Sequence, residues 1–363
     1  MYMGHSAYKL IAVKIGSNVL TRRDGTLDIT RMSALVDQVA ELHRRGTGVI
    51  LVSSGAVASG RSELKLSQQL DTVSARQLYS AVGQAKLINR YYELFRDHGI
   101  ACGQVLTTKE NFSTRRHYLN QKHCMEVMLE NGVIPVVNEN DTVSLTELMF
   151  TDNDELSGLI ASMMDVQALV ILSNIDGVYD GDPSLPGSSL IADIRQVEDA
   201  AAYITESRSS LGRGGMATKY RIATKVASEG IAVIIANGKR DNILLDLMDE
   251  DAQVPRTLFH PSQESASGVK KWIAHSEGFS KGVIHVNAGA AEAITAPARA
   301  SLLPVGVTRV EGSFDDGDIV RVVNPEGNVI AWGRIGYDSA TALATVGKRD
   351  EKPFIHSDYL YID

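Results

Sequence analysis

The sequence VIPVVNENDTVSLTELMFTDNDE, from Val133 to Glu155, decides the fold because it joins a strand to a helix through two polar clusters. The apolar run 133–137 ends at the first cluster, Asn138 to Asp141, and the second cluster, Asp152 to Glu155, leads into apolar residues at helical spacing. A strand, a polar loop and a polar helix start are typical of sites in α/β proteins. The acidic side chains are suited to a metal, to a substrate, or only to a turn and a helix cap.

Strand-like and helix-like segments alternate on both sides of this stretch. Several strands are apolar on both faces, which predicts an α/β fold with a largely parallel sheet sandwiched by helices. Thr30 is expected to cap the first long helix. The predicted strands are 9–15, 48–52, 103–106, 133–137, 168–172 and 231–236, and the predicted helices are 32–42, 73–98, 116–130, 154–164, 196–204 and 219–228.

The pattern changes near residue 260. The run 261–268 has the composition of a linker, and beyond it short β-rich runs are separated by Gly and Asp turns. We therefore predict an α/β domain at 9–259, a linker at 260–276 and a small, mainly β domain at 277–363.

Composition excludes several classes of protein. A formal net charge of −8 argues against a general nucleic-acid binder. No apolar run is long enough to span a membrane. Cys102 and Cys124 have no disulfide or zinc spacing, so we expect both to be small buried residues in a cytoplasmic protein.

The predicted strand ends gather polar and glycine-rich residues at one edge of the sheet, where ligands of such folds bind. Lys14 lies one residue before the end of the first strand, and the loop Gly212 to Gly215 precedes a helix that carries Lys219. This loop lacks the Walker A spacing, and it is suited either to a flexible surface or to a phosphate. Two lysines beside a glycine loop favour phosphoryl transfer, which needs charge stabilisation more than covalent participation.

Two neighbouring lysines repel each other, so a carboxylate is expected between them, and Asp152 or Asp154 is the candidate. The same residues are suited to capping the following helix. Asn138 and Asp141 are suited to an α-amino group, and Ser54 and Gly55 to a carboxylate; local turn bonding is the alternative.

Eight motifs together resemble the glutamate 5-kinase family, six in an amino-acid-kinase domain and two in a C-terminal PUA domain. They are VKIGSNVL (13–20), VSSGAVASG (52–60), PVVNENDTV (135–143), TDNDELSGLIA (151–161), LSNIDGVY (172–179), GRGGMATK (212–219), SLLPVGV (301–307) and GDIVRV (317–322).

The resemblance implies phosphorylation of the L-glutamate side-chain carboxylate by ATP with Mg²⁺, in proline biosynthesis. It assigns catalysis to Lys14, Lys219 and Asp154, and it assigns no side chain to the metal. It implies a homo-oligomer, a dimer or tetramer, with proline as feedback inhibitor. The implied glutamate-binding residues are Ser54, Gly55, Asn138, Asp141 and Asn153, and the implied nucleotide-binding residues are Ser173, Asn174, Arg213, Gly214, Gly215, Met216, Ala217, Thr218 and Lys219.

The chain departs from the family pattern at three positions: Asn174 replaces Asp, Arg213 replaces Thr, and Thr151 replaces Gly. All three leave the lysines and the Asp-Asn-Asp core intact, so we expect an active enzyme. Two alternatives remain open: another amino-acid kinase, such as an N-acetylglutamate kinase, or a chiefly RNA-binding PUA protein.

Overall fold

The computed structural model describes residues 8–64, 70–144, 150, 152–183, 185–195, 216–249, 251–263, 272–273, 280–296, 300–349 and 351–362. The chain divides into two compact units, Met1–Thr108 with Lys122–Ser265, and Lys109–Gln121 with Ala266–Asp363. The helix predicted at 196–204 lies outside the described residues.

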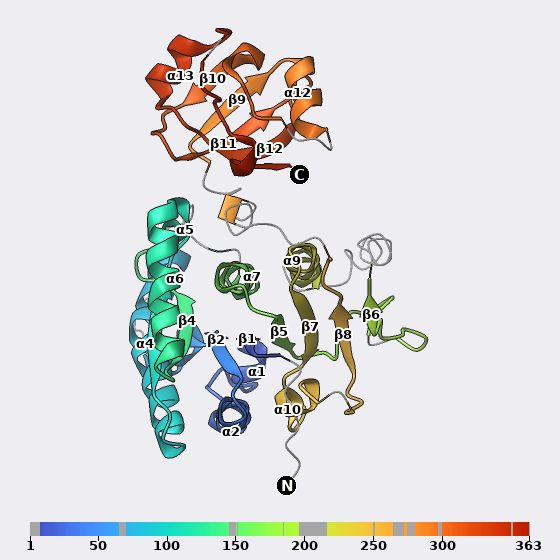
Figure 1. Ribbon diagram of the computed structural model, residues 1–363. Coiled ribbons are helices and arrows are strands. Elements are labelled where there is room, and N and C mark those ends of the chain that lie inside the picture. Colours follow the sequence, from blue (N-terminus) through green and yellow to red (C-terminus); the bar gives the residue numbers. More distant parts are fainter. Residues whose placement is uncertain are drawn as a thin grey trace. The chain divides into compact units, whose positions relative to one another are not determined.

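The first unit is built on an eight-stranded sheet in the order β3-β4-β2-β1-β5-β7-β8-β6 (Figure 1). Neighbouring strands are parallel except for the antiparallel pair β7 and β8. The predicted, largely parallel sheet is therefore confirmed. Its strands are β1 (Leu10–Ile15), β2 (Gly48–Ser53), β3 (Cys102–Thr107), β4 (Ile134–Glu139), β5 (Ala168–Ser173), β6 (Asp193–Ile194), β7 (Ala232–Asn237) and β8 (Arg256–Phe259).

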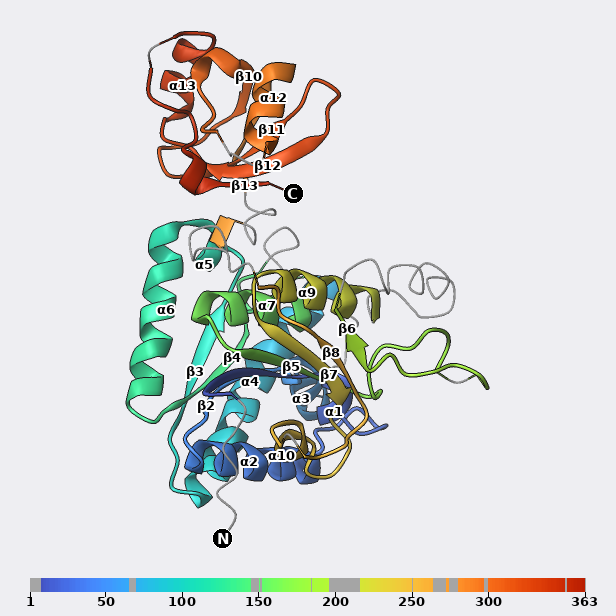
Figure 2. The ribbon, with the colours of Figure 1, turned by 45° about the vertical axis from the view of Figure 1, so that its right-hand side comes forward.

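Helices cover both faces of this sheet. Helices α2 and α10 lie on one face, and α7 and α9 lie on the other, as both views show (Figure 1, Figure 2). Strands β4 and β5 are buried along their whole length, as expected for a sheet covered on both sides. The helices of the unit are α1 (Ser17–Leu20), α2 (Ile29–Arg44), α3 (Ala56–Glu63), α4 (Thr72–Asp97), α6 (Arg115–Glu130), α7 (Asn153–Met164), α9 (Met216–Ser228) and α10 (Ile243–Leu247), the first residues of α6 belonging to the second unit.

Two local predictions were wrong. Asp28, not Thr30, caps α2: its side chain accepts a hydrogen bond from the Arg31 backbone N–H at 3.2 Å, and Thr30 lies inside the first turn. Cys124 is exposed and Cys102 is partly buried. Cys124 precedes the fully buried Met125 on α6, and one residue along a helix turns the side chain away from the buried face.

The second unit contains a five-stranded sheet in the order β10-β9-β11-β12-β13 around its own apolar core. The predicted small, mainly β region is confirmed. The segment 109–121 joins this unit through Trp272, whose indole N–H donates to the Phe112 carbonyl at 2.9 Å. Its elements are α5 (Glu110–Ser113), β9 (Gly282–Val286), α12 (Ala288–Thr295), η2 (Pro304–Gly306), β10 (Val307–Gly312), β11 (Ile319–Val323), β12 (Val329–Arg334), α13 (Ser339–Thr345), η3 (Ser357–Tyr359) and β13 (Leu360–Ile362).

Helices α3 and α4 pack with their backbones in direct contact, and glycines make this possible. A Cβ on Gly83 would lie 1.8 Å from the Ala56 carbonyl oxygen, and a Cβ on Gly60 would lie 1.8 Å from the Tyr79 carbonyl oxygen. Real Cβ atoms never approach backbone so closely. The two glycines therefore set the distance between α3 and α4.

We predict that Gly83→Ala destabilises the protein although alanine is the better helix former. Forcing the two helices apart costs about 1–3 kcal/mol, which should lower the thermal denaturation midpoint by several degrees. Asn89→Ala, at an exposed position of the same helix, is the matched control. Equal midpoints for the two variants would contradict the close-packing role of Gly83.

Candidate active site

Strand β1 places Lys14 at the point where the strand order of the sheet reverses. Strands β2 and β5 lie on opposite sides of β1, so a crevice is expected beyond the carboxyl end of β1. Side chains alternate along a strand, and Val13 and Ile15 enter the core that includes α2. Lys14 therefore points to the other face, toward α7, where it is only 5% exposed. It neither reaches solvent nor lies at an edge of the sheet.

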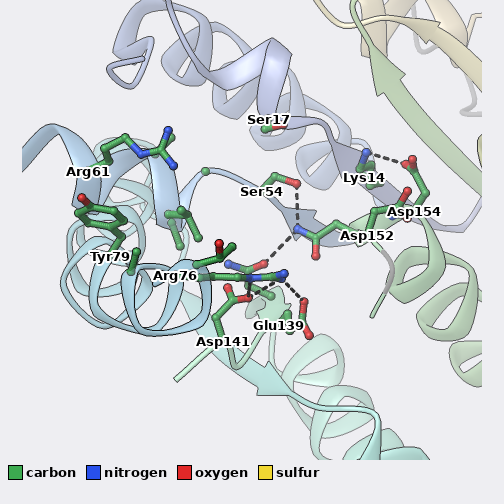
Figure 3. A pocket seen from close by; sticks show the side chains of 18 of the residues that line it. Lys14, Ser17, Ser54, Arg61, Arg76, Tyr79, Glu139, Asp141, Asp152 and Asp154 are labelled. Carbon is green, nitrogen blue, oxygen red and sulfur yellow. Dashed lines mark hydrogen bonds and ion pairs between the residues drawn. The ribbon is translucent and has the colours of Figure 1, made fainter. Parts of the chain in front are cut away.

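Asp154 lies between Lys14 and Lys219. The Lys14 ammonium is 2.6 Å from Oδ1 of Asp154 (Figure 3). The Lys219 ammonium donates to Oδ2 of Asp154 at 2.9 Å. Asp154 is 1% exposed and comes from the first turn of α7, whereas Lys219 comes from the first turn of α9. Three segments far apart in the sequence thus bring two cations to one buried carboxylate.

Asp152 caps helix α7. One carboxylate oxygen accepts hydrogen bonds from the backbone N–H groups of Asp154 at 2.9 Å and Glu155 at 3.1 Å. The cap fixes the direction of the first helical turn, and this turn carries Asp154. The acidic cluster therefore does two things: Asp152 caps the helix, and Asp154 contacts the two lysines.

Burial and charge act in opposite directions in this cluster. Burial lowers the pKa of Lys14 below its ordinary value, although the negative charge of Asp154 opposes this shift. For Asp154 burial alone would raise the pKa, but the charges of Lys14 and Lys219 outweigh it and the pKa is lowered. Burial, followed by the charge of Asp154, raises the pKa of Asp152. The negative charge of Asp154 thus opposes the effect of burial on Lys14.

Lys14, Asp152, Asp154 and Lys219 line a cavity of about 740 Å³. A chain of amide and hydroxyl groups runs along this cavity. The Asn153 side-chain N–H₂ donates to Ser54 Oγ at 2.8 Å and to Asn138 Oδ1 at 3.1 Å. Asn138 in turn donates to Gln84 Oε1 at 2.8 Å. Gly55, with a φ of 113°, turns the chain from β2 into α3 beside Ser54, a conformation that favours glycine.

Asp141 lies in the same cavity, but its nearest partner is a residue that the sequence analysis missed. Arg76 on α4 donates through Nε to Asp141 Oδ1 at 2.7 Å and through Nη2 to Glu139 Oε2 at 2.9 Å. Ser80 Oγ donates to Asp141 Oδ2 at 3.1 Å. Figure 3 shows Arg76, Asp141 and Glu139 together, apart from Lys14 and Asp154.

The missed residues carry a signal in the sequence. Arg76, Ser80 and Gln84 stand four residues apart, so they share one face of a helix, and this face meets the end of β4. A polar stripe on a long helix that is otherwise partly apolar indicates a polar partner.

The predicted nucleotide-binding residues lie at the carboxyl end of β5 and at the start of α9. Ser173 is buried at the end of β5, and Asn174 is exposed and lines a second cavity of about 640 Å³. Met216, Ala217 and Thr218 form the start of α9. Arg213, Gly214, Gly215 and the departure Thr151 lie outside the described residues.

Among the described residues, no group of three or more His, Cys, Asp and Glu side chains is placed to hold a metal ion. Asp141 is engaged by Arg76 and Ser80, and Asp152 by the helix cap. No described helix is long and apolar enough to cross a membrane.

The fold has counterparts among known proteins. The model of the amino acid kinase family matches residues 9–237, and the model of the PUA domain matches residues 282–353. Among solved structures, a carbamate kinase from Giardia lamblia covers 70% of this chain and 99% of its own, with a TM-score of 0.52 and 14% identity. A structure of isopentenyl phosphate kinase covers 69% of this chain and 99% of its own, with a TM-score of 0.50 and 16% identity. These structures share the fold, and the family match makes the chain a kinase of the amino acid kinase class.

Full-length relatives narrow this class. Glutamate 5-kinase of Bacteroides thetaiotaomicron is 66% identical over 353 residues, which are 97% of this chain and 98% of that protein. Glutamate 5-kinase of Chlorobaculum tepidum is 45% identical over 360 residues, which are 99% of this chain and 98% of that protein. The chain belongs to the glutamate 5-kinase family.

We predict that Asp154→Asn shifts the alkaline decline of kinase activity to lower pH. Lys14 is charged only below its pKa, and the charge of Asp154 raises that pKa against the effect of burial. Without this charge Lys14 loses its proton at a lower pH, so kcat should begin to fall earlier as the pH rises. Profiles of kcat against pH for the wild type and the variant measure the shift.

Asp152→Asn is the matched control, because asparagine also caps helices and Asp152 contributes less than Asp154 to the pKa of Lys14. Its alkaline decline should move less. Identical profiles for all three proteins would show that Asp154 does not keep Lys14 charged.

Proposed function

We propose that the chain transfers the γ-phosphoryl group of ATP to the side-chain carboxylate of L-glutamate, giving L-glutamyl 5-phosphate, the first step of proline biosynthesis. One observation carries this proposal: Asp154 holds Lys14 and Lys219 in a cavity that also contains Ser54, Asn153 and Asn138. One end of the cavity is suited to a phosphoryl group, and the rest of it to a small polar acceptor.

Lys14 and Lys219 stabilise the negative charge of the phosphoryl group during transfer. A unit charge at about 4 Å contributes roughly 4 kcal/mol at an effective dielectric constant of 20, so two cations supply a large share of the barrier reduction. The acceptor carboxylate is already ionised at neutral pH and needs no general base. Asp154 is a positioning residue, because it acts by holding both lysines.

The substrates occupy different parts of the site. Glutamate binds to Ser54, Gly55, Asn138, Asp141 and Asn153. ATP would enter as its Mg²⁺ complex, in which the ion would neutralise phosphate charge. Nucleotide binding falls to Ser173, Asn174 and the segment 213–219.

Other features of the proposal rest on the family resemblance. We place the kinase domain at 9–259, the linker at 260–276 and the PUA-like domain at 277–363; the family-model matches at 9–237 and 282–353 support this division. Homo-oligomerisation, inhibition by proline, RNA binding by the PUA-like domain and a cytoplasmic location stay predictions.

A substrate panel tests the proposed reaction. ATP-dependent hydroxamate formation should be most efficient with L-glutamate, and much weaker with N-acetylglutamate and L-aspartate. N-acetylation removes the positive charge that faces Asp141, and aspartate is one methylene too short to span the cavity between Asp141 and the lysines. Preferred turnover of either alternative substrate would refute the proposal.

A second experiment tests the two lysines. Lys14→Ala and Lys219→Ala should each lower kcat by on the order of 100–1000-fold, because each removes one stabilising charge from the transition state. The KM for glutamate should change little, and circular dichroism should show folded proteins. Lys86→Ala, which removes a lysine from an exposed ion pair with Glu63, should retain wild-type activity. Near wild-type kcat in either site variant would contradict the proposed role.

A further inference from the structure

Arg76 bridges two carboxylates at the end of the cavity that lies away from the lysines. Glu139 and Asp141 are 3% and 6% exposed, and Arg76 contacts both: Nη2 lies 2.9 Å from Glu139 Oε2 and 2.6 Å from Asp141 Oδ1. Arg76 thus holds a buried aspartate in the wall of the cavity, where a ligand ammonium group could bind the aspartate and a ligand carboxylate could bind the arginine.

Both Arg76 and Asp141 have unused hydrogen-bonding capacity that faces the cavity. Within the part of the chain that the structure describes, Nε and Nη2 of Arg76 bind the carboxylates and Nη1 donates no hydrogen bond. The Arg76 side chain is 35% exposed and lines the cavity. Among the described residues, Asp141 Oδ2 accepts from Ser80 alone, and a carboxylate oxygen has two lone pairs. A donor and an acceptor therefore stand side by side.

This pairing matches the head group of an α-amino acid. Its ammonium and carboxylate groups are attached to the same carbon atom, so their protein partners must be adjacent. Arg76 and Asp141 are in direct contact. Nη1 of Arg76 carries two N–H groups, and Oδ2 of Asp141 has a second lone pair. An arginine beside an aspartate satisfies both halves of the zwitterion, whereas an aspartate alone satisfies only the ammonium group.

We propose that Arg76 determines specificity for the free α-carboxylate of the acceptor: Nη1 of Arg76 binds this carboxylate while Asp141 binds the α-ammonium group. The proposal rests on the proposed function, since it assigns the far end of the same substrate. It orients glutamate with its side-chain carboxylate toward Lys14 and Lys219. Ser80 and Glu139 hold the Asp141–Arg76 pair in place.

The test combines a change in the residue with a change in the ligand. Full-length wild type, Arg76→Gln and Arg76→Lys are assayed for phosphorylation of L-glutamate and of its α-amide, which keeps the ammonium group and the side-chain carboxylate but lacks the α-carboxylate charge. Wild type should prefer glutamate by about 10–100-fold in kcat/KM, the range of a charge-assisted hydrogen bond. In Arg76→Gln this preference should collapse through a higher KM for glutamate, with little change for the α-amide. Arg76→Lys should recover part of it.

Arg90→Gln is the matched control, because Arg90 lies on the same helix in an exposed pair with Glu93; it should keep the wild-type preference. Equal losses on both substrates in Arg76→Gln, with the preference intact, would overturn the proposal and leave Arg76 as a structural residue. A wild type that uses glutamate and its α-amide equally well would also overturn it, even if the variant does not fold. A wild type that does not phosphorylate glutamate at all would instead refute the proposed function, and this proposal with it.

Discussion

The candidate active site depends on one buried carboxylate that two ammonium groups share. The largely buried side chains of Lys14 and Lys219 would repel each other, and burial alone would favour the loss of a proton from Lys14. Asp154 offsets both effects by contacting each lysine through a different oxygen. Both lysines line the cavity, where an incoming anion can reach them.

Another part of the cavity has two carboxylates around the guanidinium of Arg76. Neutral amide and hydroxyl groups, from Ser54 through Asn153 to Asn138, also line the cavity. Two lysines in one part and an arginine paired with an aspartate in another are suited to a ligand with a carboxylate at one end and a zwitterionic head group at the other.

The sequence predicted most of the fold and the lysines of the charged cluster. Strands and helices followed from apolar periodicity, and Lys14 was a candidate because it stands near the end of a strongly apolar strand. The residues left Asp152 and Asp154 open as the carboxylate between the lysines, and in the structure it is Asp154 that contacts both. Arg76 was missed because it lies inside a long helix, where a single charged side chain is usually solvent-exposed. Its role depends on which helix face meets β4, and this is a property of tertiary packing that local patterns do not encode. The spacing of Arg76, Ser80 and Gln84 was the available signal.

The packing of α4 explains how its face with Arg76, Ser80 and Gln84 comes close to the end of β4. Arg76 reaches Asp141 and Glu139 only if α4 lies close to the strand ends, and α3 lies alongside α4. Gly60 and Gly83 remove the side chains that would hold the two helices apart, so each backbone contacts the other directly. Helix α3 also begins immediately after Ser54 and Gly55. The same pair of glycines therefore sets how closely the helix that carries Arg76 packs beside the helix that follows Ser54.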